Sequence, residues 1–280
     1  MKILITGASG QLGTELCHLL DANGIVYKAT DTSQLDITDK EQVVSFFNQE
    51  KPEVVYDCAA FTAVDAAEEE PGRTVNQTVN VQGTKNLAHA TESIGATLVY
   101  ISTDYVFDGT NLAEYLEDDT PKPKNEYGRA KLTGERAVQE TVSKHYIIRT
   151  SWVFGEYGKN FVYTMQDLAK THHELSVVND QVGRPTWTKT LAEFMMYCVN
   201  ERVAYGLYQL SNEGSCSWYE FACEILKNQD VKVNAVDSTQ FPQKAYRPKH
   251  SVMNLDKAKA TGFKIISWQD ALHAFQRQIK

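Results

Sequence analysis

The chain has 280 residues, 42% hydrophobic and 23% charged, which suits one large globular domain or two smaller ones. Its net charge of −8 argues against a nucleic-acid-binding surface, because such a surface gathers cations against the phosphates. No apolar run approaches the roughly 20 residues of a membrane span, and the apolar start is too short for a signal peptide. The five cysteines are scattered without a Cys-x-x-Cys pair, so we expect a reduced, cytoplasmic protein.

The first half of the chain alternates strand and helix patterns. Residues 2–6 form a short apolar run typical of a strand buried on both faces, and a glycine-rich turn follows. Four leucines then recur at helical spacing over residues 11–20. Further strands are predicted at 25–30, 54–60, 97–102 and 145–150, and further helices at 40–49, 76–93 and 126–142. Repeated strand–helix units predict a doubly wound, Rossmann-like parallel sheet with helices on both faces.

The second half is less regular and predicts a smaller α/β lobe. Helices are expected at 161–170, 189–200, 217–227 and 267–278, and short strands at 175–178, 206–210 and 231–236. We therefore divide the chain into a dinucleotide-binding domain, residues 1–151, and a substrate-binding lobe, residues 152–280. The helix near 189–203 is expected to return to the first domain. A ligand would lie in the cleft between the lobes.

Gly7, Gly10 and Gly13 form a Gly-x-x-Gly-x-x-Gly turn between the first strand and the first helix. In a dinucleotide site, the first glycine allows the tight turn and the second lets the backbone approach the pyrophosphate. The third lets the helix lie close to the strand, and the free N–H groups at the helix start bind phosphate. Because a strand and an amphipathic helix flank it, this turn indicates a dinucleotide more strongly than an incidental glycine-rich loop would.

Asp31 follows the second predicted strand, where a ribose-binding acid is expected. A carboxylate there accepts from the ribose hydroxyls and repels a 2′-phosphate. No arginine lies beside it, although Lys28 is near, so the sequence favours NADH, with NADPH possible. If Asp31 is only a turn residue, Asp36, followed by Ile37, would be the acid near the adenosine.

Tyr127 and Lys131 are four residues apart and therefore share one face of a predicted helix. A free tyrosine has a pKa near 10, and we expect the lysine cation to lower it so that the phenol can protonate a carbonyl oxygen. Lys131 can also hold the nicotinamide ribose. Thr103 ends a predicted strand, where ligands of such sheets bind, and its hydroxyl could orient the same carbonyl. These residues predict a catalytic triad of Thr103, Tyr127 and Lys131.

These motifs resemble the extended short-chain dehydrogenase/reductase superfamily. Four further strings, at residues 58–65, 102–109, 149–155 and 180–186, look like the dTDP-4-dehydrorhamnose reductase family. The string STDYVF, followed by YGRAK at 127–131, is the most specific part, and the match runs in order along nearly the whole chain.

The resemblance implies reduction of the 4-keto group of a dTDP-linked 4-keto-6-deoxyhexose, dTDP-4-dehydro-L-rhamnose, by NAD(P)H. It assigns the cofactor, in addition to the glycines and acids above, to Gln11, Leu12, Ala59, Ala60, Thr62, Asn80, Tyr127 and Lys131. It places five residues around the sugar: Thr62, Val64, Asp104, Tyr105 and Trp152. It assigns binding of the nucleotide part of the substrate to Asn160, Arg184 and Arg247. Simpler roles remain open, since Trp152 could be core, Tyr105 could pack between lobes and Arg184 could lie in a surface loop.

Two other functions compete with a reductase. A 4,6-dehydratase or 4-epimerase could use the same scaffold, but dehydratases of this type follow the aspartate with a glutamate, and here Tyr105 follows Asp104. A non-catalytic regulatory subunit could keep the pocket without turnover, although the complete triad weakens that interpretation.

Metal binding is not expected. The histidines show no metal-ligand spacing with cysteines or carboxylates. Glu15 is an interface metal ligand in some relatives, but matching acids are not evident around residues 188–193, so a magnesium-bridged dimer is doubtful. We expect a monomer or homodimer.

Overall fold

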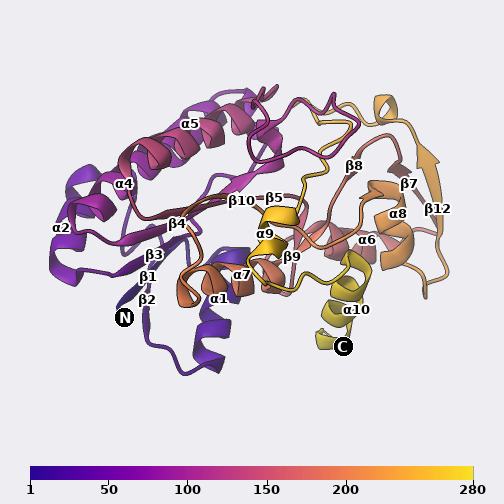
Figure 1. The fold of residues 1–280 in the computed structure, drawn as a ribbon. Coiled ribbons are helices and arrows are strands. Elements are labelled where there is room, and N and C mark those ends of the chain that lie inside the picture. Colours follow the sequence, from indigo (N-terminus) through magenta and orange to yellow (C-terminus); the bar gives the residue numbers. More distant parts are fainter. Residues whose placement is uncertain (280) are drawn as a thin grey trace.

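Six parallel strands form the central sheet of the larger lobe in the computed structural model, which describes residues 1–279 (Figure 1). Their spatial order is β10 (Gly206–Gln209), β5 (His145–Thr150), β4 (Thr97–Thr103), β3 (Val54–Asp57), β1 (Ile3–Thr6) and β2 (Tyr27–Ala29). The chain reverses its direction of winding between β1 and β3, so the predicted doubly wound sheet is confirmed.

Helices cover both faces of this sheet because successive strand residues point to opposite sides. On one face, Leu4 and Val55 pack against α2 (Lys40–Glu50), α4 (Thr84–Ser93) and α5 (Glu126–Thr141). On the other, Ile5 and Tyr56 pack against α1 (Gln11–Ala22) and α7 (Thr188–Asn200). The strands are therefore apolar on both sides, and polar side chains gather at their carboxyl ends.

The predicted helix at 76–93 is interrupted in the structure. It consists of α3 (Gly72–Gln77), a π-helical turn η2 (Thr78–Gly83) and α4, preceded by the short 3₁₀ helix η1 (Ala66–Glu68). Within the π turn, Asn80 exchanges hydrogen bonds with the backbone of Phe61, donating to its oxygen at 2.9 Å and accepting from its nitrogen at 3.1 Å. The irregular turn thus places an amide where it fixes the loop after β3.

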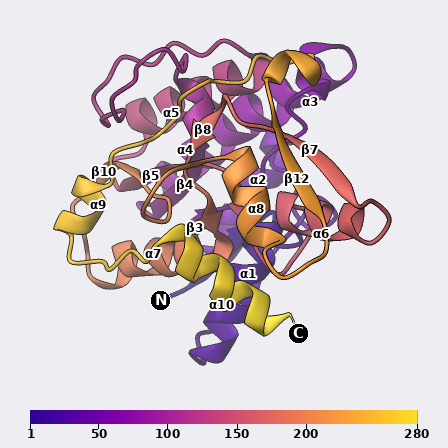
Figure 2. The same ribbon diagram turned by 90° about the vertical axis from the view of Figure 1, so that its right-hand side faces the viewer.

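The smaller lobe contains three helices that lie near one another (Figure 2). They pack around an aromatic core that includes Phe154, Phe221 and Phe275. The helices are α6 (Phe161–Ala169), α8 (Trp218–Ile225) and α10 (Trp268–Gln278). The strand pairs beside them are β7 (Glu174–Val178) with β12 (Lys232–Val236), β6 (Val153–Phe154) with β9 (Thr186–Trp187), and β8 (Val182–Gly183) with β11 (Cys216–Ser217). The remaining short helices are η3 (Asp104–Val106), η4 (Ser238–Gln240) and α9 (Asp256–Ala260).

The chain crosses between the lobes more than once. The helix predicted near 189–203 is α7, which packs against α1 in the larger lobe. The next strand, β10, also belongs there, although the division at residue 151 gave it to the smaller lobe. Leu207 and Tyr208 of β10 pair with Ile147 and Ile148 of β5, so β10 forms the edge of the sheet next to β5.

None of the helices in residues 1–279 combines the length and apolarity needed to cross a bilayer.

Candidate active site

Two adjoining cavities, of about 550 and 510 Å³, lie over the carboxyl ends of β1, β3 and β4. Both are lined by Ser9 and Gly10 of the glycine turn and by residues 58–60 after β3, so they form one elongated site. The larger cavity also touches the smaller lobe through Lys159 and Trp218. The site therefore spans the cleft in which the sequence placed a ligand.

The glycine turn brings backbone, rather than side chains, to the junction of the two cavities. Gly7 has a φ of +63°, and a Cβ there would lie 2.6 Å from the backbone of Ala59. A Cβ on Gly13 would lie 2.3 Å from the carbonyl oxygen of Gly7. Only glycine therefore allows α1 to pack this closely against the loop at Gly7. Gly10 is the N-cap of α1 and supplies no capping side chain, which leaves N–H groups of the first turn free for an anion.

The smaller cavity offers carboxylates to a ligand and no cation. Asp31 and Asp36 both line it, beside Ile37. Hydrogen bonds from the Ser33 backbone and hydroxyl lower the pKa of Asp31, so this acid stays ionised. Among the described residues that line this cavity there is no lysine or arginine, and Lys28 pairs instead with Glu50.

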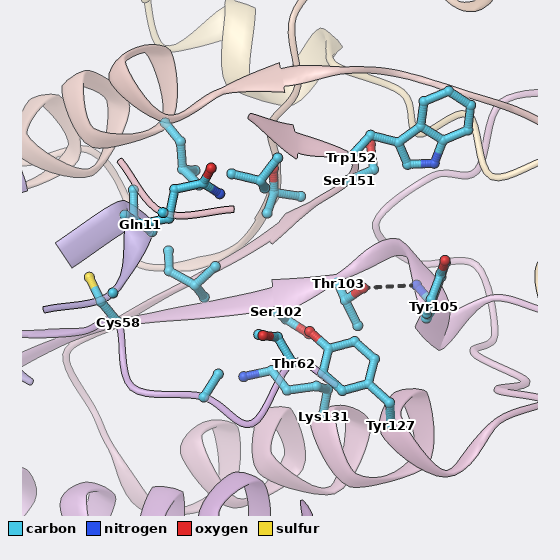
Figure 3. A pocket seen from close by; sticks show the side chains of 18 of the residues that line it. Gln11, Cys58, Thr62, Ser102, Thr103, Tyr105, Tyr127, Lys131, Ser151 and Trp152 are labelled. Carbon is cyan, nitrogen blue, oxygen red and sulfur yellow. Dashed lines mark hydrogen bonds between the residues drawn. The ribbon is translucent and has the colours of Figure 1, made fainter. Parts of the chain in front are cut away.

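Thr103, Tyr127 and Lys131 meet on one wall of the larger cavity (Figure 3). Thr103 is the last residue of β4, and its hydroxyl accepts from the backbone nitrogen of Tyr105 at 3.2 Å and donates to Asp104 Oδ1 at 3.1 Å. Tyr127 and Lys131 rise from the first turns of α5, whose N-cap Asn125 accepts from the nitrogen of Gly128 at 2.7 Å. The structure thus brings the three predicted catalytic side chains together.

The protonation of Tyr127 differs from the sequence-based expectation. Burial raises its pKa, and the negative charge of Asp104 raises it further, while a hydrogen bond with Thr103 lowers it. The net shift is therefore upward, so the expected lowering of the Tyr127 pKa is wrong for this arrangement, and the phenol holds its proton firmly at neutral pH.

Lys131 is 2% exposed, and burial lowers its pKa to about 8, against the opposing effects of the Asp57 and Glu135 charges. Its amino group lies 4.0 Å from the centre of the Tyr100 ring, a cation–π contact that favours the charged form. The lysine therefore remains mostly cationic at pH 7 despite its burial.

Asp104 adds a second acid to this wall. It is 2% exposed, and burial raises its pKa to about 6, although hydrogen bonds from Ser251 and Thr103 lower it. Its Oδ2 is buried and has no hydrogen-bond partner in residues 1–279. Asp104 also lines the cavity, so its carboxyl group lies directly behind the cavity surface.

Two stacked tryptophans form the side of the cavity nearer the smaller lobe. The rings of Trp152 and Trp218 are 3.6 Å apart between centroids and 10° from parallel. Trp152 has a φ of +48°, unusual for a bulky residue, and a Cβ on Gly183 would lie 2.6 Å from its ring. The backbone is therefore held in a conformation that presents this ring to the site. Tyr105 packs edge-on against Tyr127 at 6.1 Å.

Most of the predicted cofactor and sugar residues line one of the two cavities. The lining includes Gly7, Gly10, Gln11, Leu12, Asp31, Asp36, Ile37, Ala59, Ala60, Thr62, Thr103, Asp104, Tyr105, Tyr127, Lys131 and Trp152. Gly13, Val64 and Asn80 are not part of this lining. Gly13 packs on the Gly7 loop, Val64 is half-buried, and the Asn80 amide is occupied by Phe61.

The three residues predicted for the nucleotide part also lie outside the cavity lining. Asn160 caps α6 and donates to Gln11 Oε1 at 3.1 Å, which ties the smaller lobe to α1. Arg184 pairs with Glu114. Arg247 donates to Asp65 at 2.8 Å, with its guanidinium 5.6 Å from the centre of the Tyr105 ring, so it supports the cavity wall from outside.

Sequence reasoning missed several lining residues, notably Asp57, Lys159 and Trp218. Trp218 directly follows Ser217, which forms a capping box with Glu220, so Trp218 begins α8 close to where the sequence predicted a helix to start. Nothing in the local pattern says that this helix start faces the glycine turn.

The parallel sheet, the glycine turn and the Thr103–Tyr127–Lys131 set define a dinucleotide-dependent oxidoreductase of the extended short-chain dehydrogenase/reductase type. The family model described as RmlD substrate binding domain matches residues 1–280, and the chain belongs to this family.

Relatives along the whole chain agree with this assignment. A dTDP-4-dehydrorhamnose reductase of Aggregatibacter actinomycetemcomitans is 41% identical, with 97% of each sequence covered. The crystal structure of a dTDP-4-dehydrorhamnose reductase from Clostridium acetobutylicum is 44% identical, with a TM-score of 0.96 over 100% of this chain and 99% of that one. The enzyme of Bacillus anthracis in complex with NADP is 41% identical, with a TM-score of 0.95 and 99% of each chain covered. The predicted family is therefore confirmed.

Proposed function

We propose that this protein is a dTDP-4-dehydrorhamnose reductase, which reduces the 4-keto group of dTDP-4-dehydro-L-rhamnose to give dTDP-L-rhamnose. The observation that carries this proposal is the convergence of Thr103, Tyr127 and Lys131 on the cavity that begins at the glycine turn. The full-length relatives that bear this activity in their names support the substrate class.

The glycine turn would hold a nicotinamide cofactor, which would supply the hydride for C4 of the sugar. The chain supplies the proton: the phenol of Tyr127 donates to the carbonyl oxygen as it becomes a hydroxyl, and the Thr103 hydroxyl orients that oxygen. The Lys131 ammonium then stabilises the phenolate until solvent reprotonates it. The raised pKa of Tyr127 keeps its proton in place before the reaction, as a general acid requires.

The sugar is proposed to lie between the triad and the smaller lobe. Asp104 and Tyr105 contribute from the end of β4, and Trp152 contributes an aromatic face. Asn160, Arg184 and Arg247 remain the proposed residues for the nucleotide part. Each of them is occupied by a protein partner, so the proposal requires a local rearrangement on binding.

For the cofactor we propose NADH in preference to NADPH. The support is the adenosine end of the site, where Asp31 and Asp36 would repel a 2′-phosphate and where no cation stands among the described lining residues. The Bacillus anthracis relative was crystallised with NADP, so NADPH remains the alternative to be measured.

We further propose that the protein acts in the cytoplasm as a monomer or homodimer without a metal. The free thiols of Cys17, Cys58, Cys198, Cys216 and Cys223 fit a reducing compartment. Sedimentation with and without magnesium or a chelator tests the oligomeric state and metal dependence.

The decisive experiment follows NADH and NADPH consumption with dTDP-4-dehydro-L-rhamnose made in situ, with the product identified by NMR. Stoichiometric loss of reduced cofactor with formation of dTDP-L-rhamnose is expected. A different C4 epimer would keep the chemistry and change the product. Tight cofactor binding without consumption would contradict the proposal and favour an epimerase or a non-catalytic subunit.

A further inference from the structure

Asp57 is a buried carboxylate on the cavity wall with one oxygen unused. It is the last residue of β3 and is 2% exposed. Its Oδ1 accepts from the Thr6 hydroxyl at 2.7 Å and from the backbone nitrogen of Ala59 at 3.2 Å. Its Oδ2 is buried and finds no hydrogen-bond partner within residues 1–279. An unpaired carboxylate oxygen in such a place is costly unless a charge nearby compensates it.

The compensating charge is Lys131. Two carboxylates act on this lysine, Asp57 from β3 and Glu135 from the next turn of α5, and Asp57 has the stronger effect in raising the lysine pKa. Glu135 is already held by Arg149 through two hydrogen bonds of 2.9 and 2.8 Å. Its charge is therefore largely neutralised, whereas that of Asp57 is not.

The other titratable groups around this pair are neutral. Burial raises the pKa of Tyr100 and of Cys58 well above their ordinary values, and burial also raises the pKa of Tyr127. Burial raises the pKa of Asp57 too, while the Lys131 charge and the hydrogen bonds from Thr6 and Ala59 lower it, so among the described residues Asp57 is the carboxyl group left to act on Lys131.

We propose that Asp57 is the electrostatic partner of Lys131, a positioning residue that keeps the lysine ammonium charged and held at the cavity wall. Both side chains line the same cavity, and Oδ2 has no hydrogen-bond partner within the described residues, so the two groups act on each other through their charges rather than by a direct hydrogen bond. This inference rests on the proposed function only for its consequence: the charged lysine is the form that stabilises the Tyr127 phenolate.

Asp57→Asn tests the proposal because it removes the charge and keeps the shape. The asparagine oxygen can still accept from Thr6 and Ala59 in place of Oδ1. With ¹³Cε-labelled lysine, NMR follows the titration of Lys131 directly, and the resonance is assigned by its loss in Lys131→Arg. We expect the Lys131 pKa to fall by about 1–2 units in Asp57→Asn, since a nearby opposite charge shifts a pKa by roughly that amount.

Asp167→Asn is the matched control. It makes the same change in net charge on α6 of the smaller lobe, where the Asp167 side chain is 70% exposed. This variant should leave the Lys131 titration unchanged. In kinetics, the high-pH limb of kcat should move to lower pH in Asp57→Asn and stay in place in Asp167→Asn.

An unmoved Lys131 titration in folded Asp57→Asn would overturn the proposal, because Asp57 would then be protonated or too distant to matter. If the variant does not fold, the wild-type protein decides, since its Lys131 resonance must show a second inflection where the Asp57 carboxyl titrates, and a single inflection refutes the coupling. Neither measurement uses substrate, so a failed reductase assay and a failed Asp57 assignment give distinguishable results.

Discussion

Alanine at Gly7 tests whether the close contact between two loops shapes the dinucleotide site. Gly7 has a φ of +63°, and its Cβ would lie 2.6 Å from both Cα and N of Ala59. Gly24 offers a matched control, since its φ is +65° and a Cβ there has nothing within 4 Å. Both substitutions carry the left-handed backbone cost of about 1–2 kcal/mol, and only Gly7→Ala adds a steric conflict.

The size of that conflict follows from the distance. Ordinary van der Waals contact of a Cβ begins at 3.4 Å, so the 2.6 Å approach forces one loop back by nearly an ångström. We expect Gly24→Ala to lose about 1–2 kcal/mol of unfolding free energy with unchanged cofactor binding. Gly7→Ala should lose about 1–3 kcal/mol more through overpacking. Because misplacement by 1 Å can reduce rate about 10²-fold, its kcat/KM for NADH should fall by about that factor.

Denaturant unfolding gives the free energies, and the fluorescence of bound NADH gives the dissociation constants. The comparison rests on the difference between the two variants, which removes the shared backbone cost. If Gly7→Ala and Gly24→Ala lose the same stability and bind NADH equally well, the contact with Ala59 does not shape the site.

Three further substitutions test other parts of the site. Tyr127→Phe should lower kcat by about 10²–10⁴-fold while NADH still binds, as removal of a general acid predicts, and near-normal turnover would exclude the role. Trp218→Ala, which removes the ring stacked 3.6 Å from Trp152, should raise KM for the sugar nucleotide by about 2–10-fold with kcat nearly unchanged, as loss of one aromatic contact predicts. Burial and the neighbouring Glu156 carboxyl raise the pKa of Glu15 from 4.5 to about 7. Between pH 4.5 and pH 7 the folded protein therefore keeps a proton on Glu15 that the unfolded chain has lost. Because of this difference, the free energy of unfolding falls as the pH rises through that range. Glu15→Gln should weaken this dependence, so its unfolding free energy should rise relative to that of the wild type by up to about 3 kcal/mol from pH 4 to pH 8. Denaturant unfolding measures this, and a difference that stays constant with pH would contradict it.

The features predicted from sequence are those set by short-range pattern. The Gly7–Gly13 turn, the Tyr127–Lys131 spacing and the strand end at Thr103 each depend on a few consecutive residues and on the rule that ligands bind at the carboxyl ends of parallel strands. The structure places them together as predicted. The doubly wound, parallel character of the sheet followed from the same alternation of strands and helices.

The features that were missed depend on contacts between distant segments. Trp218 reaches the cavity because α8 of the smaller lobe stacks it on Trp152, and β10 joins the larger sheet through pairing with β5. The expected lowering of the Tyr127 pKa failed for a related reason. Helical spacing gives the distance to Lys131, but burial and the charge of Asp104, which decide the result, come from the tertiary fold.

The two buried acids of the cavity, Asp104 and Asp57, each favour the protonated form of a proposed catalytic side chain. Asp104 raises the pKa of Tyr127, and Asp57 raises that of Lys131. Burial alone would keep the phenol protonated, but it would also strip the lysine of its proton. The proposed reductase needs Tyr127 protonated, so that it can donate to the substrate. It also needs Lys131 protonated, so that the positive charge stabilises the phenolate that remains. A carboxylate near the lysine is therefore the element that burial makes necessary, and Asp57 is the unpaired acid that supplies it.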